Sequence, residues 1–201
     1  MRPESTHSSS SRRGATTVEM ALVLTVFVIL LFAAMELGRA MYLWNTLQHV
    51  TRQAARDATV TDFTDASAMA VVKQNAIFRG ITGTNPGALI AAPEITDASI
   101  RITYHSIDAA GALHDVDLTT TATCPPKVVT DCVSDPNGAT CIRFVQVRIC
   151  DPSNAAACNP VKYQAMVLPA FIAGFANLYL PISPSILPAE SLGFRPSSPS
   201  C

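Results

Sequence analysis

The longest apolar stretch of the chain runs from Met20 to Met35 and reads MALVLTVFVILLFAAM, with no charge and with Thr25 as its only polar residue. As a helix this stretch rises only ~24 Å, but extension back to Ala15 takes in Glu19 and gives ~31 Å, enough for the ~30 Å hydrocarbon core of a bilayer. A buried core helix usually keeps a polar face, which is missing here. The pattern therefore predicts a transmembrane helix over residues 15–37.

A cleaved secretory signal is the main alternative to a retained anchor. The leader MRPESTHSSSSRR is polar and basic, as the first part of such a signal would be. The cleavage end fits less well, because neither Ala33-Ala34-Met35 nor Gly38-Arg39-Ala40 is a clean small-x-small site. The helical pattern also continues past the apolar run. We therefore expect residues 1–14 to be a disordered leader, followed by a retained membrane helix.

Residues 38–80 are predicted to be an amphipathic helical region. The apolar positions follow helical spacing and would continue the membrane helix to about Val60: Met41, Trp44, Leu47, Val50, Ala54, Ala55 and Ala58. The polar cluster TDFTDAS then breaks the helix. Thr64 or Asp65 can cap a second, short helix that ends near Gly80.

Residues 81–201 change to a strand pattern. Apolar and polar side chains alternate from Ile100 to Tyr104, and Val116 and Leu118 suggest a second strand. The β-rich segments Ile142–Ile149 and Val161–Val167 are expected to pair as a hairpin, with a Pro- and Ser-rich tail after them. The fold class is thus α+β: a long N-terminal helix, a short second helix and a small antiparallel β-sheet domain.

Six cysteines lie in the C-terminal part, and five of them fall within 35 positions: Cys124, Cys132, Cys141, Cys150 and Cys158, with Cys201 at the end. Their spacings of eight or nine residues lack the CxxC pairs typical of zinc sites, so disulfides are the better interpretation. Cys150 with Cys158 is the first candidate for a local bridge, and Cys124 with Cys132 or Cys141 is the next. Six cysteines allow 15 connectivities, which leaves the pairing open.

Charge alone does not orient the chain in a membrane. Arginines flank the span on both sides: Arg2, Arg12 and Arg13 before it, and Arg39, Arg52 and Arg56 after it. Disulfides form in oxidising compartments, so the cysteines place the C-terminal domain in the periplasm or outside the cell and the N-terminus in the cytoplasm. The expected location is the inner membrane, with a single pass.

Composition and motifs indicate no enzyme. The net charge is −1 and basic residues are scattered, which argues against a nucleic-acid partner. None of the motifs GxSxG, GxxxxGK[ST], HExxH or GxGxxG occurs in a suitable context. His105 and His114 could face each other across a bend, but a third metal ligand is not evident, and Asp115 and Asp117 fit a solvated face. We expect no catalytic residues, cofactor, metal or small-molecule substrate.

One motif, at the junction of the leader and the transmembrane helix, suggests a mechanism of processing and assembly. Residues 12–20 read RRGATTVEM, with Gly14 at the end of a basic leader and Glu19 five positions later. This resembles the processing site of type IV prepilins, where a prepilin peptidase cuts after the glycine and would make Ala15 the new N-terminus. Glu19 would then lie one turn inside the bilayer, where a carboxylate is costly unless a neighbouring subunit's amine compensates it. Alternatively, Glu19 is a boundary charge that reaches back to water.

Residues 12–60 closely resemble the TadE-like family, the minor pilin-like proteins of tight-adherence (Tad/Flp) pilus systems. The matching features are GATTVEMAL, the apolar run, MELGRAMY and QAARDA. The family resemblance implies prepilin peptidase, pilin subunits and other pilus-assembly proteins as partners, besides the lipid bilayer. Glu36, Gly38 and Arg39 belong to it: Glu36 and Arg39 can pair on one helix face, and Gly38 would let another helix approach. A simple polar girdle at the membrane boundary is the alternative.

Three functional hypotheses remain open from the sequence. The first is a minor pilin-like component, or pseudopilin, that is processed after Gly14 and serves pilus assembly. The second is an uncleaved single-pass adaptor that binds other envelope proteins. The third is a secreted enzyme or binding protein with an ordinary signal. The mature N-terminus separates them: Ala15 supports the first, Met1 the second, and a start near residue 36 or 41 the third.

Overall fold

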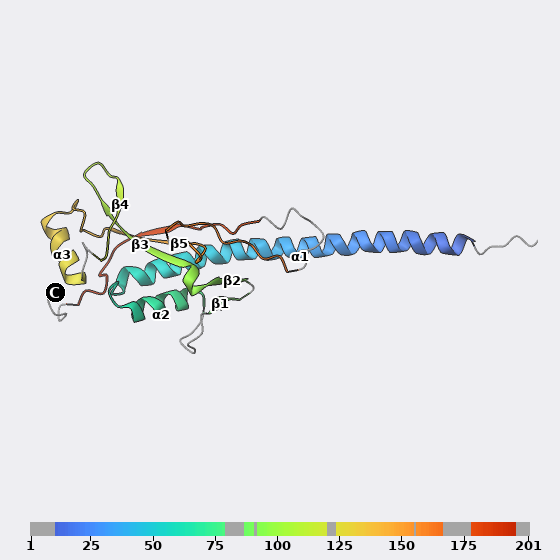
Figure 1. Ribbon diagram of the computed structural model, residues 1–201, viewed down its shortest axis with the longest axis horizontal. Helices are drawn as coiled ribbons and strands as arrows, with labels where there is room; N and C mark the ends of the chain where they lie inside the picture. Colours follow the sequence, from blue (N-terminus) through green and yellow to red (C-terminus); the bar gives the residue numbers. More distant parts are fainter. Residues whose placement is uncertain are drawn as a thin grey trace, which may run out of the picture.

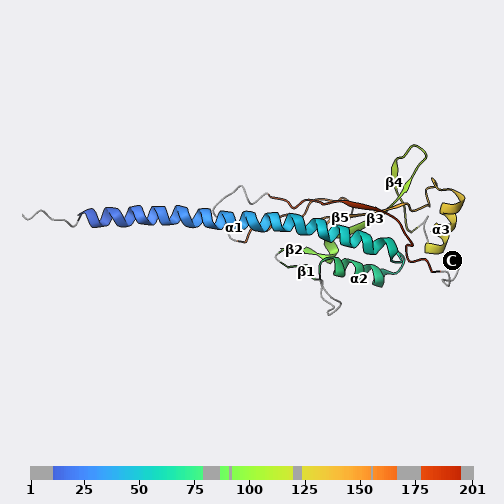
Figure 2. The ribbon, with the colours of Figure 1, turned by 180° about the vertical axis from the view of Figure 1, so that it is seen from behind.

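The protein is a long helix whose second half is built into a small domain, while its first half projects alone (Figures 1 and 2). The computed structural model describes residues 11–78, 87–90, 92–119, 124–154, 156–166 and 178–195, with side chains from Gly14 onward. The helices are α1 (Ser11–Val60), α2 (Ala66–Ala76) and α3 (Pro125–Ser134), with a 3-10 turn η1 (Asp97–Ser99). The strands are β1 (Ala88–Leu89), β2 (Ala92–Thr96), β3 (Ile100–Ile107), β4 (Leu113–Asp115), β5 (Phe144–Ile149) and β6 (Ser185–Pro188).

The first half of α1 packs against nothing in the described chain. Large apolar side chains from Val18 to Met35 keep between 37% and 64% of their surface exposed. This is one helix long and apolar enough to cross a membrane, as predicted. The helix begins at Ser11, however, so the last four residues of the expected disordered leader (residues 1–14) are helical, whereas residues 1–10 lie outside the described part.

The second half of α1 forms the centre of the hydrophobic core. Its inner face is fully buried: Leu43, Leu47, Val50, Ala54, Ala55 and Ala58. The strands β3, β5 and β6 contact this face, and α2 lies beside it. In β5 the alternate residues Val145, Val147 and Ile149 are fully buried, the two-residue period of a sheet with one face on the core. The helix ends at Val60, as the sequence predicted.

The main sheet is antiparallel throughout, with the strand order β4-β3-β5-β6, and β1 and β2 form a separate pair. The predicted hairpin between Ile142–Ile149 and Val161–Val167 is wrong. The neighbours of β5 are β3 and β6, while the described residues 161–166 run beside residues 178–180 through a Lys162↔Tyr179 bridge. Alternation identifies an extended segment but not its partner, and the strand beside β5 comes instead from the Pro- and Ser-rich tail. Its Pro188 is tolerated because β6 is an edge strand.

Other elements match the expectations in part. Asp65 caps α2 by accepting hydrogen bonds from the backbone N–H groups of Ser67 and Ala68, and the expected helix end at Gly80 lies outside the described residues.

The predicted strand at Val116 and Leu118 is displaced, because β4 ends at Asp115 and only the Val116 N–H still bonds to β3, at Tyr104 O. The α3 helix was not predicted. Two prolines occupy its first turn, where the missing N–H groups are not needed.

Candidate functional site

The residues of the prepilin-like motif lie near the free end of α1. Gly14, Ala15 and Glu19 are all exposed, and a Cβ at Gly14 would meet nothing within 4 Å. The Gly14 carbonyl accepts a hydrogen bond from Thr17 Oγ1 at 2.8 Å, which belongs to the helix itself. No contact with the domain covers this end in the described chain, so the motif is open to another protein.

Glu36 and Arg39 lie where α1 enters the domain, and they form an ion pair. Arg39 Nη1 is 3.1 Å from Glu36 Oε1, and their side chains are only 12% and 1% exposed. Spacing of three residues puts both on one helix face. That face turns toward the domain, so neither charge lies on the outward surface of the helix.

The partners of this pair come from a segment far along the chain. The Tyr163 hydroxyl donates a hydrogen bond to Glu36 Oε1, and the Met166 N–H donates to the same oxygen at 3.4 Å. Arg39 Nη1 donates to the Gln164 carbonyl at 2.7 Å and to Tyr163 Oη at 3.0 Å, and the guanidinium lies over the Tyr163 ring, 4.9 Å from its centroid. The segment therefore supplies donors to the carboxylate and acceptors to the guanidinium.

A second carboxylate shares the same arginine. Glu94 Oε1 lies 3.7 Å from Arg39 Nη2 and accepts the Gln164 N–H at 3.4 Å. The Glu94 side chain is 3% exposed, and its other oxygen, Oε2, has no hydrogen-bond partner among the described residues. We call Glu36, Arg39, Glu94 and Tyr163 the basal cluster. Buried charges require such mutual compensation, because an isolated one costs several kcal/mol in lost hydration.

The electrostatics of the basal cluster also affect Tyr163. Burial, together with the hydrogen bond that the hydroxyl donates to Glu36, raises the pKa of Tyr163 to about 12. The phenol thus keeps its proton at neutral pH and remains a donor. Sequence patterns identified Glu36 and Arg39 but missed Glu94 and Tyr163, since nothing near those residues indicates that they converge on the helix.

Gly38 lies on the opposite side of α1 from the basal cluster. It is exposed, and a Cβ there would meet nothing within 4 Å. Leu37 and Met41 beside it are 56% and 58% exposed. The close helix approach that Gly38 was expected to allow is therefore not used inside the described chain.

The cysteines form disulfides, as predicted. Cys150 joins Cys158, and Cys132 joins Cys141, with Cα atoms 4.8 and 4.7 Å apart. The expectation that Cys124 pairs with Cys132 or Cys141 is wrong, because those two bond to each other across the end of α3; Cys124 is also disulfide-bonded. The Cys150–Cys158 bridge ties the end of β5 to the segment that carries Tyr163.

The two histidines do not face each other as suggested. His105 Nδ1 lies 2.8 Å from Asp115 Oδ1, while His114 Nε2 lies 3.0 Å from Asp108 Oδ2. Thr103 Oγ1 is 3.1 Å from His105 Nε2, so a hydroxyl, an imidazole and a carboxylate stand in a row. The clefts described in the protein are lined by other residues, and Asp115 is 78% exposed. The row is thus a polar cross-strand contact on the sheet surface.

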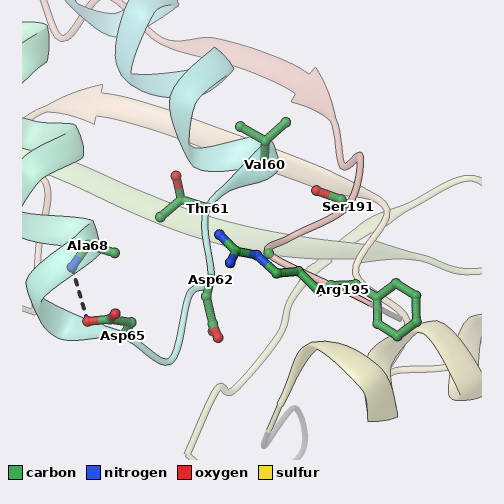
Figure 3. A pocket seen from close by; sticks show the side chains of 9 residues that line it. Val60, Thr61, Asp62, Asp65, Ala68, Ser191 and Arg195 are labelled. Carbon is green, nitrogen blue, oxygen red and sulfur yellow. Dashed lines mark hydrogen bonds between the residues drawn. The ribbon is translucent and has the colours of Figure 1, made fainter. Parts of the chain in front are cut away.

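An open cleft of about 500 Å³ lies at the far end of the domain from the bare half of α1, between the α1–α2 turn and the tail (Figure 3). Asp62 and Asp65 line it, but each carboxylate already accepts hydrogen bonds from its own turn, from Thr64 and from Ser67 and Ala68. Gly193 closes one side and lies against the Asp62 backbone. The tail is bonded to the end of α1 by the Leu192 N–H, which donates to the Thr59 carbonyl at 2.9 Å.

Comparison with known proteins gives one match. A search of curated proteins found no match, and neither did a search of solved structures. A family model described as TadE-like protein matches residues 14–56. That range starts at the glycine of the prepilin-like motif and includes both halves of α1, with Glu36 and Arg39. The resemblance predicted from the sequence is confirmed: from Gly14 to Arg56 the chain matches the TadE-like family.

Proposed function

We propose that this protein is a minor pilin-like component for the assembly of a Tad/Flp-type pilus, anchored in the inner membrane with its domain in the periplasm. The TadE-like match supports a role related to a Tad pilus. Disulfides support an oxidising compartment for the domain. Its partners would be prepilin peptidase, pilin subunits and other pilus-assembly proteins, and it would act by assembly and not by catalysis.

The observation that carries this proposal is the form of α1. One uninterrupted helix of 50 residues bears the motif Gly14–Glu19 at its free end, continues as an exposed apolar rod and ends as the core of the domain. An apolar surface of this kind packs equally well against lipid chains and against other apolar helices. The same helix can therefore anchor the protein in the membrane and later pack against other subunits in an assembly. At the lipid boundary the Glu19 carboxylate would favour a neighbour that brings a positive N-terminus.

The test is the mature N-terminus. The full chain would be produced in a host with the matching prepilin peptidase, and membrane-bound protein would be analysed by intact mass spectrometry. We expect a chain that begins at Ala15, and retention of Met1 in a Gly14→Leu variant. Gly38→Leu is the matched control, because its site is equally open but outside the motif. A wild-type chain that begins at Met1 would contradict processing.

A second candidate, the uncleaved single-pass adaptor, is favoured by one observation. Glu36 and Arg39, the charges expected to act in helix assembly, are engaged with Tyr163 and Gln164 of the same chain. The domain thus completes its own contacts at the membrane boundary without a neighbour. Retention of Met1 together with co-purification of other envelope proteins would support this adaptor.

A further inference from the structure

The outward face of α1 stays apolar beyond the expected end of the span at residue 37. Leu37, Met41, Tyr42 and Trp44 keep between 51% and 58% of their surface exposed, on the side away from the domain. These four residues form what we call the collar. It continues directly from the exposed apolar side chains of the bare half of the helix.

The basal cluster keeps two charged side chains away from this face, which would otherwise interrupt its apolar surface. Between Met20 and Thr51 the only Asp, Glu, Lys or Arg residues are Glu36 and Arg39. Glu36 is buried and Arg39 is half-buried, both on the domain side, so the outward face presents no such charge until Arg52. From sequence alone Glu36 marks the end of the span, but in the fold it does not face the surroundings of the helix.

Helix geometry places the collar at a definite depth. Glu19 and Arg39 lie 20 positions apart. At 1.5 Å per residue this is ~30 Å, the thickness of the hydrocarbon core, so with Glu19 at one boundary Arg39 lies at the other. Trp44 is then ~7 Å further out, within the headgroup layer, where Trp and Tyr concentrate in membrane proteins because their rings have an apolar body and a polar end.

We propose that the collar is a lipid-binding surface seated among the phospholipid headgroups and upper acyl chains of the periplasmic leaflet. The domain then rests on the membrane, and the basal cluster lies at the lipid boundary with Tyr163 and Met166 covering Glu36 on the domain side. Met166 is itself 60% exposed and adds apolar surface at this level. The inference rests on the membrane anchoring in the proposed function and adds the depth and the lipid contact.

Trp44 is the only tryptophan of the chain, which allows a direct test. The full-length protein would be reconstituted in phosphatidylethanolamine–phosphatidylglycerol vesicles. Quenching of Trp44 fluorescence would be measured with lipids brominated high or low on the acyl chain, and with iodide in the water. Two reference proteins carry Trp44→Phe plus one new probe: Phe27→Trp in the middle of the bare helix, and Val133→Trp on α3, where the native side chain is 82% exposed.

We expect Trp44 to fall between the two references. Its emission should be bluer than that of the Val133→Trp probe and less blue than that of the Phe27→Trp probe. Lipids brominated near the headgroup should quench it more than lipids brominated near the chain end, whereas the Phe27→Trp probe should show the reverse. Iodide should quench it less than the Val133→Trp probe.

Two results would overturn the lipid contact alone. In the first, Trp44 is as accessible to iodide as the Val133→Trp probe and insensitive to brominated lipid, while the Phe27→Trp probe is quenched by lipid. In the second, lipid quenching of Trp44 disappears as protein is concentrated in the vesicles, which would show that a second copy covers the collar. If the Phe27→Trp probe itself escaped lipid quenching, the membrane anchoring would be wrong, and the inference would fail with it.

Discussion

The hydroxyl of Tyr163 donates a hydrogen bond to the carboxylate of Glu36, a residue 127 positions earlier in the chain. Glu36 is 2% exposed and lies where the helix leaves its bare half and enters the domain. The contact therefore closes the domain around the helix at the end nearest the bare half of α1. The basal cluster ties the orientation of the domain to the axis of the anchor.

Replacement of Tyr163 by phenylalanine should destabilise the domain. The ring remains, but Glu36 loses its hydroxyl donor and Arg39 loses an acceptor, which for a buried charged group costs about 1–3 kcal/mol. The free energy of unfolding of the full chain in detergent, followed by near-ultraviolet circular dichroism, would measure the loss. Tyr179→Phe is the matched control, because that side chain is 53% exposed. Equal stabilities of the two variants would contradict a structural role for the basal cluster.

Stability should fall in alkaline solution. Burial and the bond to Glu36 raise the pKa of Tyr163 from 10.0 to about 12. The folded state keeps this proton longer than the unfolded state, so the stabilising contribution is complete below about pH 10 and disappears as the pH rises toward 12. Unfolding measured from pH 8 to pH 12 should show this slope, and Tyr163→Phe should reduce it. Burial also raises the pKa of Tyr104, so part of the slope should remain in the variant.

Two glycines with left-handed backbone should respond very differently to alanine. Gly111 and Gly193 have φ angles of +86° and +81°, but a Cβ at Gly111 meets nothing within 4 Å, whereas at Gly193 it would lie 2.4 Å from the Asp62 backbone nitrogen. Gly111→Ala should cost about 1–2 kcal/mol from backbone strain alone. Gly193→Ala adds overpacking, about 1–3 kcal/mol more, and should detach the tail from the end of α1. Thermal unfolding compares them, and similar losses would refute the close packing at Asp62.

The two local disulfides should stabilise different parts of the domain. Each closes a loop of eight or nine residues, for which chain entropy gives about 2–3 kcal/mol. Replacing Cys150 and Cys158 by serine should also loosen the basal cluster, because this bridge ties β5 to the segment of Tyr163. The Cys132→Ser, Cys141→Ser protein should lose stability but keep the cluster. Hydrogen exchange at the Met166 N–H, which bonds to Glu36, reports the difference, and equal protection in both proteins would contradict it.

Local patterns predicted the helices of the N-terminal half well. The apolar run, the helical spacing up to Val60 and the cap at Asp65 are encoded within a few residues of where they act, and the structure contains all three. The α+β class and the presence of disulfides were also predictable. The α3 helix was not predicted, although Pro125 and Pro126 lie in its first turn, where prolines are well accommodated.

Partners of strands and of buried charges were not predictable in the same way. Alternation marked the segment of Tyr163 as extended, but it could not show that β5 would pair with the Ile186–Leu187 region, or that Tyr163 would reach Glu36. The first pairing joins residues 40 positions apart, such as Gln146 and Ile186, and the second joins residues 127 positions apart. Of the basal cluster, the sequence patterns therefore identified only Glu36 and Arg39, which lie close together in the chain.

The order in which these parts are synthesised has a consequence for export. Glu36 and the inner face of α1 from Leu43 to Ala58 are made early, while the strands that cover them come later in the chain, and Tyr163 follows Glu36 by 127 positions. Under the proposed orientation, a chain that has crossed the membrane only in part exposes the apolar inner face of α1 and the Glu36 carboxylate, because the residues that cover them have not yet followed. Burial of this face is then complete only when β6, the last strand of the main sheet in chain order, has followed.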